Sequence, residues 1–580
     1  MNSIKQHLNS IVGAAMGSAC QLENCNANVI TASRPEFGDY QANGVMAIAK
    51  QLRQNPREIA QQVVSELEAQ NHEAIGKLEV AGPGFINIHL DDAFLRATAS
   101  EAIAADSLLA LTDEPLKIAV DYSSPNLAKE MHVGHLRGTI IGDCLVRVLE
   151  KLGHTVVRQN HVGDWGTQFG MLITYMEELS AAASESSAEL SGHLADLETF
   201  YKDAKDRFDN DESFANASRQ SVVKLQSGDA SSIAAWEKFI DESMRHCEEI
   251  YQKLGVTLTR EHLDAESRYN EDLPKIVADL EGKNLLTESE GARCVFLDEF
   301  VGKEGDPLPL IVQKSDGGFL YSTTDLAAIR WRVKENIDRA LYVVDARQSL
   351  HFQQVFAVAR EAGFTGDGIE LEHVAYGTIM GSDGRPFKTR SGDSVKLVAL
   401  LDEGIRRAYE LVKEKNPDLD DDEHQLIASK VGIGAVKYAD LSKNRTSDYV
   451  FEWDSMLSFE GNTAPYMLYA YARICSILRK AGDYPASEIT ELNAPEERVL
   501  ALKILQLPET VHAVARDCYP NQLCNYLYEL AGLFMRFYEA CPILKAEDSA
   551  RSSRLALATL TARTLQQGLD LLGIETLEKM

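Results

Sequence analysis

The chain has 580 residues, of which 45% are hydrophobic and 25% are charged, and this composition excludes a disordered, collagen-like or coiled-coil protein. At roughly 100–200 residues per domain, the length predicts about three to five domains. Acidic residues outnumber basic ones by 88 to 58, and the net charge of −30 argues against binding of bulk nucleic acid unless local patches differ in charge.

The nine cysteines are scattered and form no Cys-x-x-Cys pair. This pattern predicts reduced thiols in a cytoplasmic protein without a structural metal site. No stretch approaches the roughly 20 apolar residues that a membrane span requires. We therefore expect a soluble, cytoplasmic protein that does not enter a membrane.

Residues 1–113 have the pattern of an α+β unit. A helix is predicted over 52–67, with Pro56 near its start. The glycines at 82 and 84 predict a turn into an alternating strand that ends near Leu90. The polar run at 112–115 is the expected boundary.

The next segment, 114–395, has an α/β pattern. Short strands are predicted at 116–120 and from 155, with a helix over 133–152 between them, and this order indicates a right-handed parallel βαβ unit. The pattern returns with a strand at 341–344, a helix N-capped by Ser349 that reaches 362, and a strand at 371–379.

An acidic, mainly helical insertion is expected within this segment at about 181–300, which holds 13 basic and 26 acidic residues. A connecting helical segment is predicted at 396–454. A helical domain is predicted at 455–580, where 12 basic and 15 acidic residues nearly balance.

The sequence contains neither a G-x-x-x-x-G-K-[ST] loop nor a G-x-G-x-x-G turn, so a phosphate would be held in another way. The candidate is the segment from His132 to His135, at a predicted helix N-terminus, where free N–H groups and the helix dipole favour an anion. Gly134 would let a ligand approach the backbone, and both imidazoles can donate to phosphate oxygens. Such a four-residue pattern also fits a purely structural turn. Its place after the first strand, between Lys129 and Arg137, favours the functional interpretation.

A basic loop follows the strand that ends near Ile379. Residues 380–396 hold four basic and two acidic residues in an otherwise acidic chain, and their glycines and serines predict a mobile loop. Taken alone the loop fits a solvated turn. Together with the histidine pair it could close over a triphosphate.

These motifs resemble those of the class I arginyl-tRNA synthetases. The stretch 123–138 is similar to the signature of that family, and its His132–His135 segment is similar to the HIGH motif. Other pieces resemble the family in the same order along the chain, from about residue 34 to the C-terminus: Gly163-Asp164-Trp165-Gly166, Tyr321-Ser322-Thr323-Thr324-Asp325, Pro386-Phe387-Lys388-Thr389-Arg390 and Asn462-Thr463-Ala464-Pro465-Tyr466.

The resemblance implies a multidomain α/β protein. Residues 1–113 would form an α+β appendage that touches tRNA, and 114–395 a class I Rossmann-type catalytic domain with its helical insertion. Residues 455–580 would form an all-α anticodon-binding bundle. A monomer is expected.

The resemblance also implies an arginine–tRNA ligase. Such an enzyme uses ATP to form arginyl-adenylate, releases pyrophosphate and transfers the arginyl group to tRNA(Arg), with adenylate formation expected to need tRNA. Mg²⁺ is expected with ATP and without a dedicated protein site. By similarity, His132 and His135 are the catalytic histidines, and the residues implied for ATP binding are His132, Gly134, His135, Gly381, Arg385 and Lys388.

One departure from the general class I pattern concerns the KMSKS loop. Its standard form is absent, and Gly381-Ser382-Asp383-Gly384-Arg385 stands there instead. Some arginyl enzymes look similar, and the resemblance implies that Lys129 supplies the missing charge. Lys388 is the competing candidate.

A guanidinium is planar and always charged, and carboxylates match its fork of donors. By similarity the arginine-binding residues are Ser124, Asn126, Glu266, Tyr321, Asp325 and Gln348. Asp264 is an equally good acid by pattern, and Asp325 could instead be a helix-terminal residue that favours the dipole.

Single-stranded bases stack on aromatic faces, so aromatic residues of the C-terminal helices are candidate tRNA contacts. The same aromatic residues, at helical spacing, could instead form the core between these helices. The predicted tRNA-binding residues are Phe85, Asn87, Tyr466, Tyr469, Arg473, Phe537, Tyr538 and Met580.

Three alternatives remain at this point. Another class I synthetase is one, although the cysteine enzyme needs a zinc thiolate set, and the glutamate and glutamine enzymes should line the pocket with cations. A tRNA-binding paralogue without catalysis is the second, and the intact His132, His135 and Lys129 argue against it. The third is a nucleotidyltransferase, which would not need the helical C-terminal region.

Overall fold

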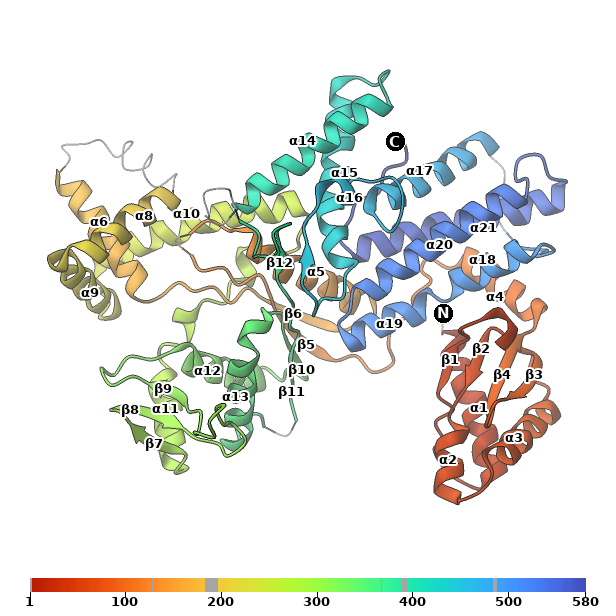
Figure 1. Cartoon of the computed structure of the whole chain (residues 1–580), viewed down its shortest axis with the longest axis horizontal. Helices are drawn as coiled ribbons and strands as arrows, with labels where there is room; N and C mark the ends of the chain where they lie inside the picture. The colour runs from red at the N-terminus through yellow and green to blue at the C-terminus, as the bar shows by residue number, and fades with distance from the viewer. Residues whose placement is uncertain (1–2, 128, 183–196, 367, 389–394, 483–487) are drawn as a thin grey trace. The chain divides into compact units, whose positions relative to one another are not determined.

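The computed structural model describes residues 3–127, 129–182, 197–366, 368–388, 395–482 and 488–580. They form two compact units, one made of 1–112, 458–570 and 575–580, the other of 113–457 and 571–574. Figure 1 labels the helices and strands in chain order. Among the described helices, none combines the length and apolar character needed to cross a membrane.

The N-terminal part of the first unit is an α+β fold, as predicted. Its antiparallel sheet has the strand order β1-β2-β4-β3. The strands are β1 (Val29–Thr31), β2 (Tyr40–Ala42), β3 (Ile75–Ala81) and β4 (Phe85–Leu90), and the helices are α1 (Ile4–Cys20), α2 (Val45–Leu52), α3 (Pro56–Gln70) and α4 (Asp92–Ala104).

The prediction of one helix over 52–67 is wrong at its start. The helix α2 ends at Leu52, and Arg53 takes a left-handed backbone conformation with φ of 55°. The next helix, α3, begins at Pro56, with the Asn55 side chain accepting a hydrogen bond from the backbone of Arg57. Proline fits the first position of a helix and not its interior, so one helix ends before Pro56 and a new helix begins at it.

The C-terminal part of the first unit is all-helical, as predicted. Its helices are α17 (Ala464–Ala481), α18 (Pro495–Leu505), α19 (Leu507–Asp517), α20 (Asn521–Ala540) and α21 (Asp548–Leu571). Helix α20 packs on α17, α18 and α19.

The second unit is built on a parallel sheet with the strand order β11-β10-β5-β6, which confirms the predicted α/β pattern. The strands are β5 (Lys117–Asp121), β6 (Thr155–Gln159), β10 (Arg339–Tyr342) and β11 (Glu370–His373). Helix α5 (Leu136–Lys151) connects β5 to β6, while α12 (Tyr321–Lys334) and α13 (Ser349–Glu361) lie beside β10 and β11 (Figure 1). The core here is apolar and includes Ala119, Leu326, Ala340 and Val355.

Two details of this region differ from the sequence-based expectations. The predicted strand 371–379 is two strands, because β12 (Ile379–Met380) leaves the sheet and pairs with β13 (Tyr449–Val450). Ser349 does not cap α13, since a single 3-10 turn precedes it and the Ser349 hydroxyl donates to the carbonyl of Ala346 at 2.7 Å.

The predicted insertion is helical only in part. Helix α6 (Thr167–Ala182) leads into it, and its described helices are α8 (Leu197–Asn210), α9 (Glu212–Gln226), α10 (Ala230–Leu254) and α11 (Leu273–Gly282). An antiparallel sheet follows, made of β7 (Leu286–Ser289), β8 (Ala292–Val295) and β9 (Leu310–Gln313). Residues 183–196 of the predicted insertion lie outside the described residues. The connecting segment holds α14 (Leu397–Lys415), α15 (Asp421–Leu441) and α16 (Trp453–Met456).

Candidate active site

The motifs singled out in the sequence follow the carboxyl ends of the parallel strands. Strands β5, β6, β10 and β11 end at residues 121, 159, 342 and 373. The segments that leave them are 122–135, 160–166, 343–351 and 374–388. Because the carboxyl ends of parallel strands meet at one edge of a sheet, these segments gather there, where open α/β sheets bind their ligands.

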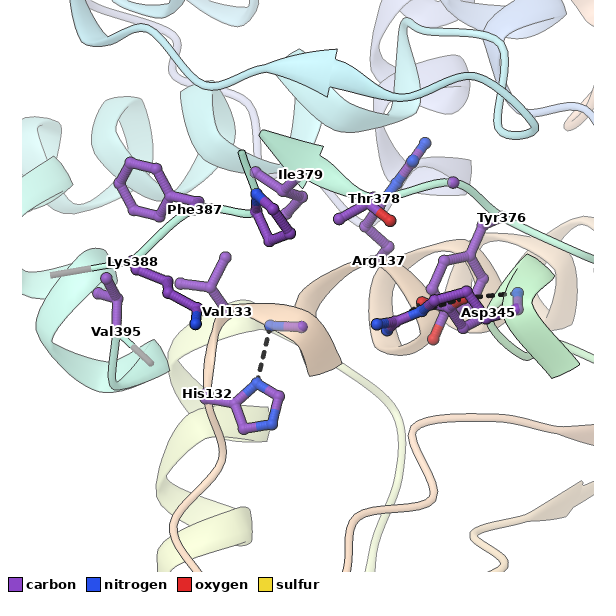
Figure 2. A pocket seen from close by; sticks show the side chains of 14 residues that line it. His132, Val133, Arg137, Asp345, Tyr376, Thr378, Ile379, Phe387, Lys388 and Val395 are labelled. Carbon is purple, nitrogen blue, oxygen red and sulfur yellow. Dashed lines mark hydrogen bonds and ion pairs between the residues drawn. The ribbon is translucent and has the colours of Figure 1, made fainter. Parts of the chain in front are cut away.

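A cavity of about 320 Å³ lies beside the histidine segment. Figure 2 shows the Lys388 side chain extending toward the turn that carries His132 and Val133. The described residues that line the cavity are His132, Val133, Gly134, Arg137, Asp345, Arg347, Tyr376, Gly377, Thr378, Ile379, Pro386, Phe387, Lys388 and Val395. This lining contains three cationic side chains, Arg137, Arg347 and Lys388, together with His132 and one carboxylate. The carboxylate, Asp345, is held by Arg347 at 2.7 Å, so the cavity favours an anion.

The two histidines are paired in a defined geometry. Their ring centroids lie 4.1 Å apart. The backbone N–H of Gly134 donates to His132 Nδ1 at 3.0 Å, and the backbone N–H of His132 donates to His135 Nδ1 at 3.1 Å. His132 therefore accepts at Nδ1 and carries its proton at Nε2, where it can donate to a ligand oxygen. His135 Nδ1 also lies 3.2 Å from the carbonyl of His132, to which it donates in the other tautomer.

Both rings are neutral at physiological pH. Burial lowers the pKa of His132, and the charges of Lys129 and Arg347 lower it further. Burial and the neighbouring His132 ring lower the pKa of His135 to about 3. The histidines thus act as hydrogen-bond donors, and the positive charge at this site comes from lysine and arginine side chains.

Gly134 is required by the shape of this turn. A Cβ atom at this position would lie 2.7 Å from His132 Cε1. Any side chain would therefore displace the His132 ring. The sequence predicted that a ligand approaches the backbone at Gly134, and in the structure the neighbour at this position is the His132 ring.

The other residues predicted for ATP binding fall into two groups. Lys388 lines the cavity. Gly381 donates from its backbone to the carbonyl of Arg385 at 2.7 Å, so these two residues close a tight turn, and neither belongs to the lining. Lys129 is exposed and is not among the lining residues either.

An acidic cluster brings together four of the residues predicted to line an arginine pocket, namely Asn126, Glu266, Tyr321 and Asp325. The residue Gly163 adjoins both Asn126 and Glu266, since a Cβ atom there would lie 3.7 Å from Glu266 Oε1 and closer still to Asn126 Oδ1. The charges of Glu266 and Asp325 act on each other, and Tyr321 is within electrostatic reach of Glu266. These four side chains come from the loop after β5, the 264–269 segment and α12.

The structure distinguishes Glu266 from Asp264. Asp264 is buried and already bonded, to Tyr269 at 2.8 Å, Gln159 at 2.8 Å and Arg268 at 2.9 Å. Burial, together with the charges of Asp164 and Asp325, raises the pKa of Glu266 to about 7, although His161 opposes the shift. Glu266 is therefore a carboxylate that would gain from an incoming cation, while Asp264 is a structural acid.

Two cations near these acids, His161 and the buried Arg332, were missed by the sequence analysis. Burial favours the neutral ring of His161, but the Asp264 hydrogen bond and the charges of Asp121 and Asp325 outweigh it and raise the pKa of His161 to about 9. Arg332 is fully buried and forms an ion pair with Asp121 at 2.9 Å. Single basic residues in a loop and a helix give no local sign of such pairing.

His351 is a third residue that the sequence did not indicate. Its Nε2 lies 2.6 Å from Asp325 Oδ2, so one oxygen of that carboxylate is held from α13. Gln348 lies three residues earlier, in the exposed 3-10 turn before α13. Ser124 has a left-handed φ of 46°, and its hydroxyl donates to Asp121 Oδ1 at 3.0 Å.

The helix that follows the histidine pair is tied to the connecting segment by a buried ion pair. Arg137 Nε lies 3.0 Å from Asp440 Oδ2, and both side chains are buried. The Arg137 Nη1 donates to the carbonyl of Ser447 at 3.0 Å, and its guanidinium packs over the rings of Tyr376 and Tyr449. One guanidinium thus joins α5 to α15, to Tyr376 and to the segment 447–449.

Aromatic and basic side chains of α17 and α20 form a cluster in the first unit. The rings of Tyr466 and Tyr528 lie 5.7 Å apart, and the Arg473 guanidinium lies 4.9 Å from the Tyr538 ring centroid. Tyr469 is 41% exposed, and Arg473 donates to its hydroxyl at 3.5 Å. Tyr528, also exposed, was not among the predicted residues.

Two predicted tRNA contacts are buried in the protein. Phe537 is fully buried and packs against Phe534, so it has no ring face for a base, and we remove it from the set. Asn87 is 3% exposed and accepts a hydrogen bond from Gln41 at 2.7 Å, so we remove it as well. Phe85 is half-buried at the start of β4, and Met580 is half-buried at the chain end.

Models of three protein families match the chain. Residues 2–90 match the model described as "Arginyl tRNA synthetase N terminal domain", 98–453 match "tRNA synthetases class I (R), catalytic domain", and 467–580 match "DALR anticodon binding domain".

Individual proteins are similar over the whole length. The arginine–tRNA ligase of Chromobacterium violaceum is 56% identical, and the match covers 100% of both chains. That of Laribacter hongkongensis is 58% identical over 95% of both. The crystal structure of arginyl-tRNA synthetase from Plasmodium falciparum is similar with a TM-score of 0.83 at 29% identity, and that of Thermus thermophilus with 0.83 at 26% identity, each covering 100% of both chains.

Proposed function

The chain belongs to the arginyl-tRNA synthetase family, and from this membership we infer that it is an arginine–tRNA ligase. It joins L-arginine to tRNA(Arg) with cleavage of ATP to AMP and pyrophosphate. The observation that best supports arginine as the substrate is the acid pair Glu266 and Asp325 at the carboxyl edge of the sheet, next to a basic cavity. Another class I synthetase and an inactive paralogue are not favoured.

In the first step the arginine carboxylate attacks the α-phosphorus of ATP, an O–P bond forms, and pyrophosphate leaves. Such a displacement depends on positioning and charge stabilisation more than on a protein nucleophile. We assign His132 and His135 to hydrogen bonding of phosphate oxygens through Nε2, and Lys129 to stabilisation of the developing charge. Lys388 remains the competing lysine, and its place in the cavity lining supports a contact with ATP.

Mg²⁺ would enter with ATP. Among the described lining residues of the cavity the one carboxylate, Asp345, is already paired with Arg347. This donor set fits phosphate better than a bare cation, so the phosphates of ATP would supply the ligands of the metal.

The acidic cluster would hold the guanidinium of arginine. We assign Glu266 and Asp325 to accept its hydrogen bonds, Tyr321 to offer a ring face and hydroxyl, and Asn126 to bind the other end of the substrate. Ser124 and Gln348 complete the proposed set. Lysine presents a compact ammonium in place of the planar fork and would leave these carboxylates poorly paired, at a cost of about 1–3 kcal/mol for each lost partner.

In the second step a ribose hydroxyl at the tRNA end attacks the arginyl carbonyl, and AMP leaves. We propose that the helical region 455–580 reads the anticodon loop through Tyr466, Tyr469, Arg473 and Tyr538. The segment 1–113 would contact the tRNA body near Phe85, and Met580 would lie close to the anticodon. The division into catalytic segment 114–395 and connecting segment 396–454 is kept as part of this proposal.

Three further expectations belong to this proposal. The enzyme is a monomer, adenylate formation requires tRNA, and the reaction takes place in the cytoplasm. All nine cysteines lie in the described part of the chain as thiols, which supports a reducing compartment.

ATP–pyrophosphate exchange with each amino acid in turn, with and without tRNA(Arg), tests the function. We expect exchange with arginine alone, and only when tRNA is present. Exchange with another amino acid in preference to arginine would refute the substrate, while exchange without tRNA would refute only the tRNA requirement.

A further inference from the structure

The inference concerns Lys129, which the proposed function makes a catalytic lysine. Its ammonium is not directed at another charged residue among the contacts of the described chain. It stands over the ring of Tyr201, 4.3 Å from the ring centroid. Tyr201 lies on α8, in the acidic insertion, and is half-buried there.

The same helix also contacts Lys396, the last residue of the basic loop. Lys396 Nζ lies 3.1 Å from Glu198 Oε2, and also 3.1 Å from Glu130 Oε2. Glu198 precedes Tyr201 by three residues, so the two side chains share one face of α8. This face therefore contacts Lys129 through a ring and Lys396 through a carboxylate.

The backbone ties both lysines to the histidine turn. The N–H of Val133 donates to the carbonyl of Val395 at 2.9 Å, and the N–H of Leu397 donates to the carbonyl of Met131 at 2.9 Å. The chain segments that carry Lys129 and Lys396 therefore run side by side next to His132. Helix α8 therefore contacts both segments that meet beside His132, where we propose that the ATP phosphates bind.

The chemistry of the contact differs from that of an ion pair. An aromatic face attracts an ammonium by its quadrupole without neutralising the charge. A carboxylate at the same place would form a salt bridge that a phosphate would have to break. At an exposed site a cation–π contact shifts a population by about two- to fivefold, which is small enough for phosphate to displace it.

We propose that Tyr201 is a positioning residue for Lys129: its ring holds the lysine ammonium beside the histidine pair until ATP binds, and Glu198 fixes α8 in the place this requires. The proposal rests on the proposed function of Lys129. It gives the insertion a role in amino-acid activation, through a residue that never touches the substrate.

The test compares Tyr201→Leu with Tyr201→Phe in ATP–pyrophosphate exchange at saturating arginine and tRNA. The phenylalanine variant keeps the ring face, so its kcat/KM for ATP should stay within about twofold of wild type. The leucine variant should lose about three- to tenfold in kcat/KM for ATP, with the KM for arginine unchanged. Phe208→Leu is the matched control, because it removes another ring of α8 that contacts Arg219 instead and should leave exchange unaltered.

A double-mutant cycle separates positioning from general stability. In a Lys129→Ala background, Tyr201→Leu should have no further effect on kcat/KM for ATP. An equal loss in both backgrounds, a loss in Tyr201→Phe as large as in Tyr201→Leu, or no loss in Tyr201→Leu would each overturn the proposal. Tyr201→Met, which also lacks the ring, replaces the leucine variant if the latter unfolds.

The outcomes also distinguish this proposal from the proposed function. If Lys129→Ala alone leaves exchange unchanged, the catalytic role of Lys129 is wrong and the proposal falls with it. If Lys129→Ala is impaired and Tyr201→Leu is not, the role of Lys129 stands and only the positioning role of Tyr201 is refuted.

Discussion

Glu266 gives the most quantitative prediction, because the free enzyme holds this carboxyl in an unusual state. Burial is the main cause of its raised pKa, the charges of Asp164 and Asp325 add to it, and His161 opposes it, with a pKa of about 7 as the result. A protonated carboxyl has no charge to offer a guanidinium. The kcat/KM for arginine, which reports ionisations of the free enzyme, should therefore rise as the pH rises through 7.

The size of the effect follows from the same value. A group with a pKa of about 7 is about 10% ionised at pH 6 and about 90% ionised at pH 8, so kcat/KM for arginine should increase about tenfold between them. Glu266→Gln should abolish this slope. At pH 8 it should also lower kcat/KM by about 10- to 150-fold, the equivalent of about 1.5–3 kcal/mol for a lost charged hydrogen bond.

The assay is ATP–pyrophosphate exchange between pH 6 and 8, with ATP and tRNA saturating and arginine varied. Glu261→Gln is the matched control, since this exposed acid precedes the pocket on the same segment and should keep the wild-type slope. A Glu266→Gln enzyme with the wild-type slope would show that another group titrates. A wild-type profile without a slope near pH 7 would refute the reasoning altogether.

The same carboxyl has a consequence for stability. Its folded-state pKa of about 7 lies above the ordinary value of 4.5, so the folded protein binds this proton more tightly than the unfolded chain does. Stability is therefore lost as the pH rises from about 4.5 through 7. Glu266→Gln should melt at a higher temperature than wild type at pH 8 and show little difference at pH 5, so the substitution that harms arginine binding should stabilise the fold.

Three further predictions concern single side chains. Lys129→Ala should slow arginine activation by about 10²–10³-fold with little change in the KM for arginine, measured by pyrophosphate exchange, and an unchanged rate would remove this lysine from catalysis. His351→Leu should raise the KM for arginine about 5- to 20-fold because Asp325 loses the donor that orients it, whereas His351→Gln should retain most of the affinity, and equal effects of both would contradict the orienting role. Arg137→Met should lower the free energy of unfolding by about 3–5 kcal/mol in a urea titration, because it leaves Asp440 as an unpaired buried acid, and a loss below about 1 kcal/mol would show that the pair is dispensable.

Local patterns predicted the parts of the site that lie close together in sequence. The histidine turn, the strand before it and the helix after it could all be placed because apolar runs, a glycine and a helix start occur within about 35 residues. The strand predicted at 341–344 is observed at Arg339–Tyr342, a shift of two residues that is usual for element ends.

Pairings between distant elements could not be derived from spacing. Glu266 and Asp325 are almost 60 residues apart, and only the resemblance to a family put them in one pocket. His161 and His351 were missed because a lone histidine in a loop or a first helical turn looks the same whether or not a carboxylate faces it. Phe537 and Tyr538 are neighbours on one helix, and which of them faces the core depends on the packing of α20, which the aromatic stripe alone does not determine.

The net charge of −30 is reconciled with a nucleic-acid substrate by where the charges lie. Much of the acidity belongs to the insertion, while three cationic side chains line the cavity and the C-terminal helices are nearly neutral. Such a surface repels bulk polyanions and still offers local contacts, so binding of tRNA should be selective and weakened by salt.

The most direct test of the central claim is aminoacylation itself. Purified full-length protein is incubated with ATP, Mg²⁺, each radiolabelled amino acid and either tRNA(Arg) or an unrelated tRNA, and the label in acid-precipitated RNA is counted. We expect label in RNA with arginine and tRNA(Arg), and background in every other combination. Folded protein that binds tRNA(Arg) but transfers no arginine to it, or transfers a different amino acid, would contradict the assignment of this chain as an arginine–tRNA ligase.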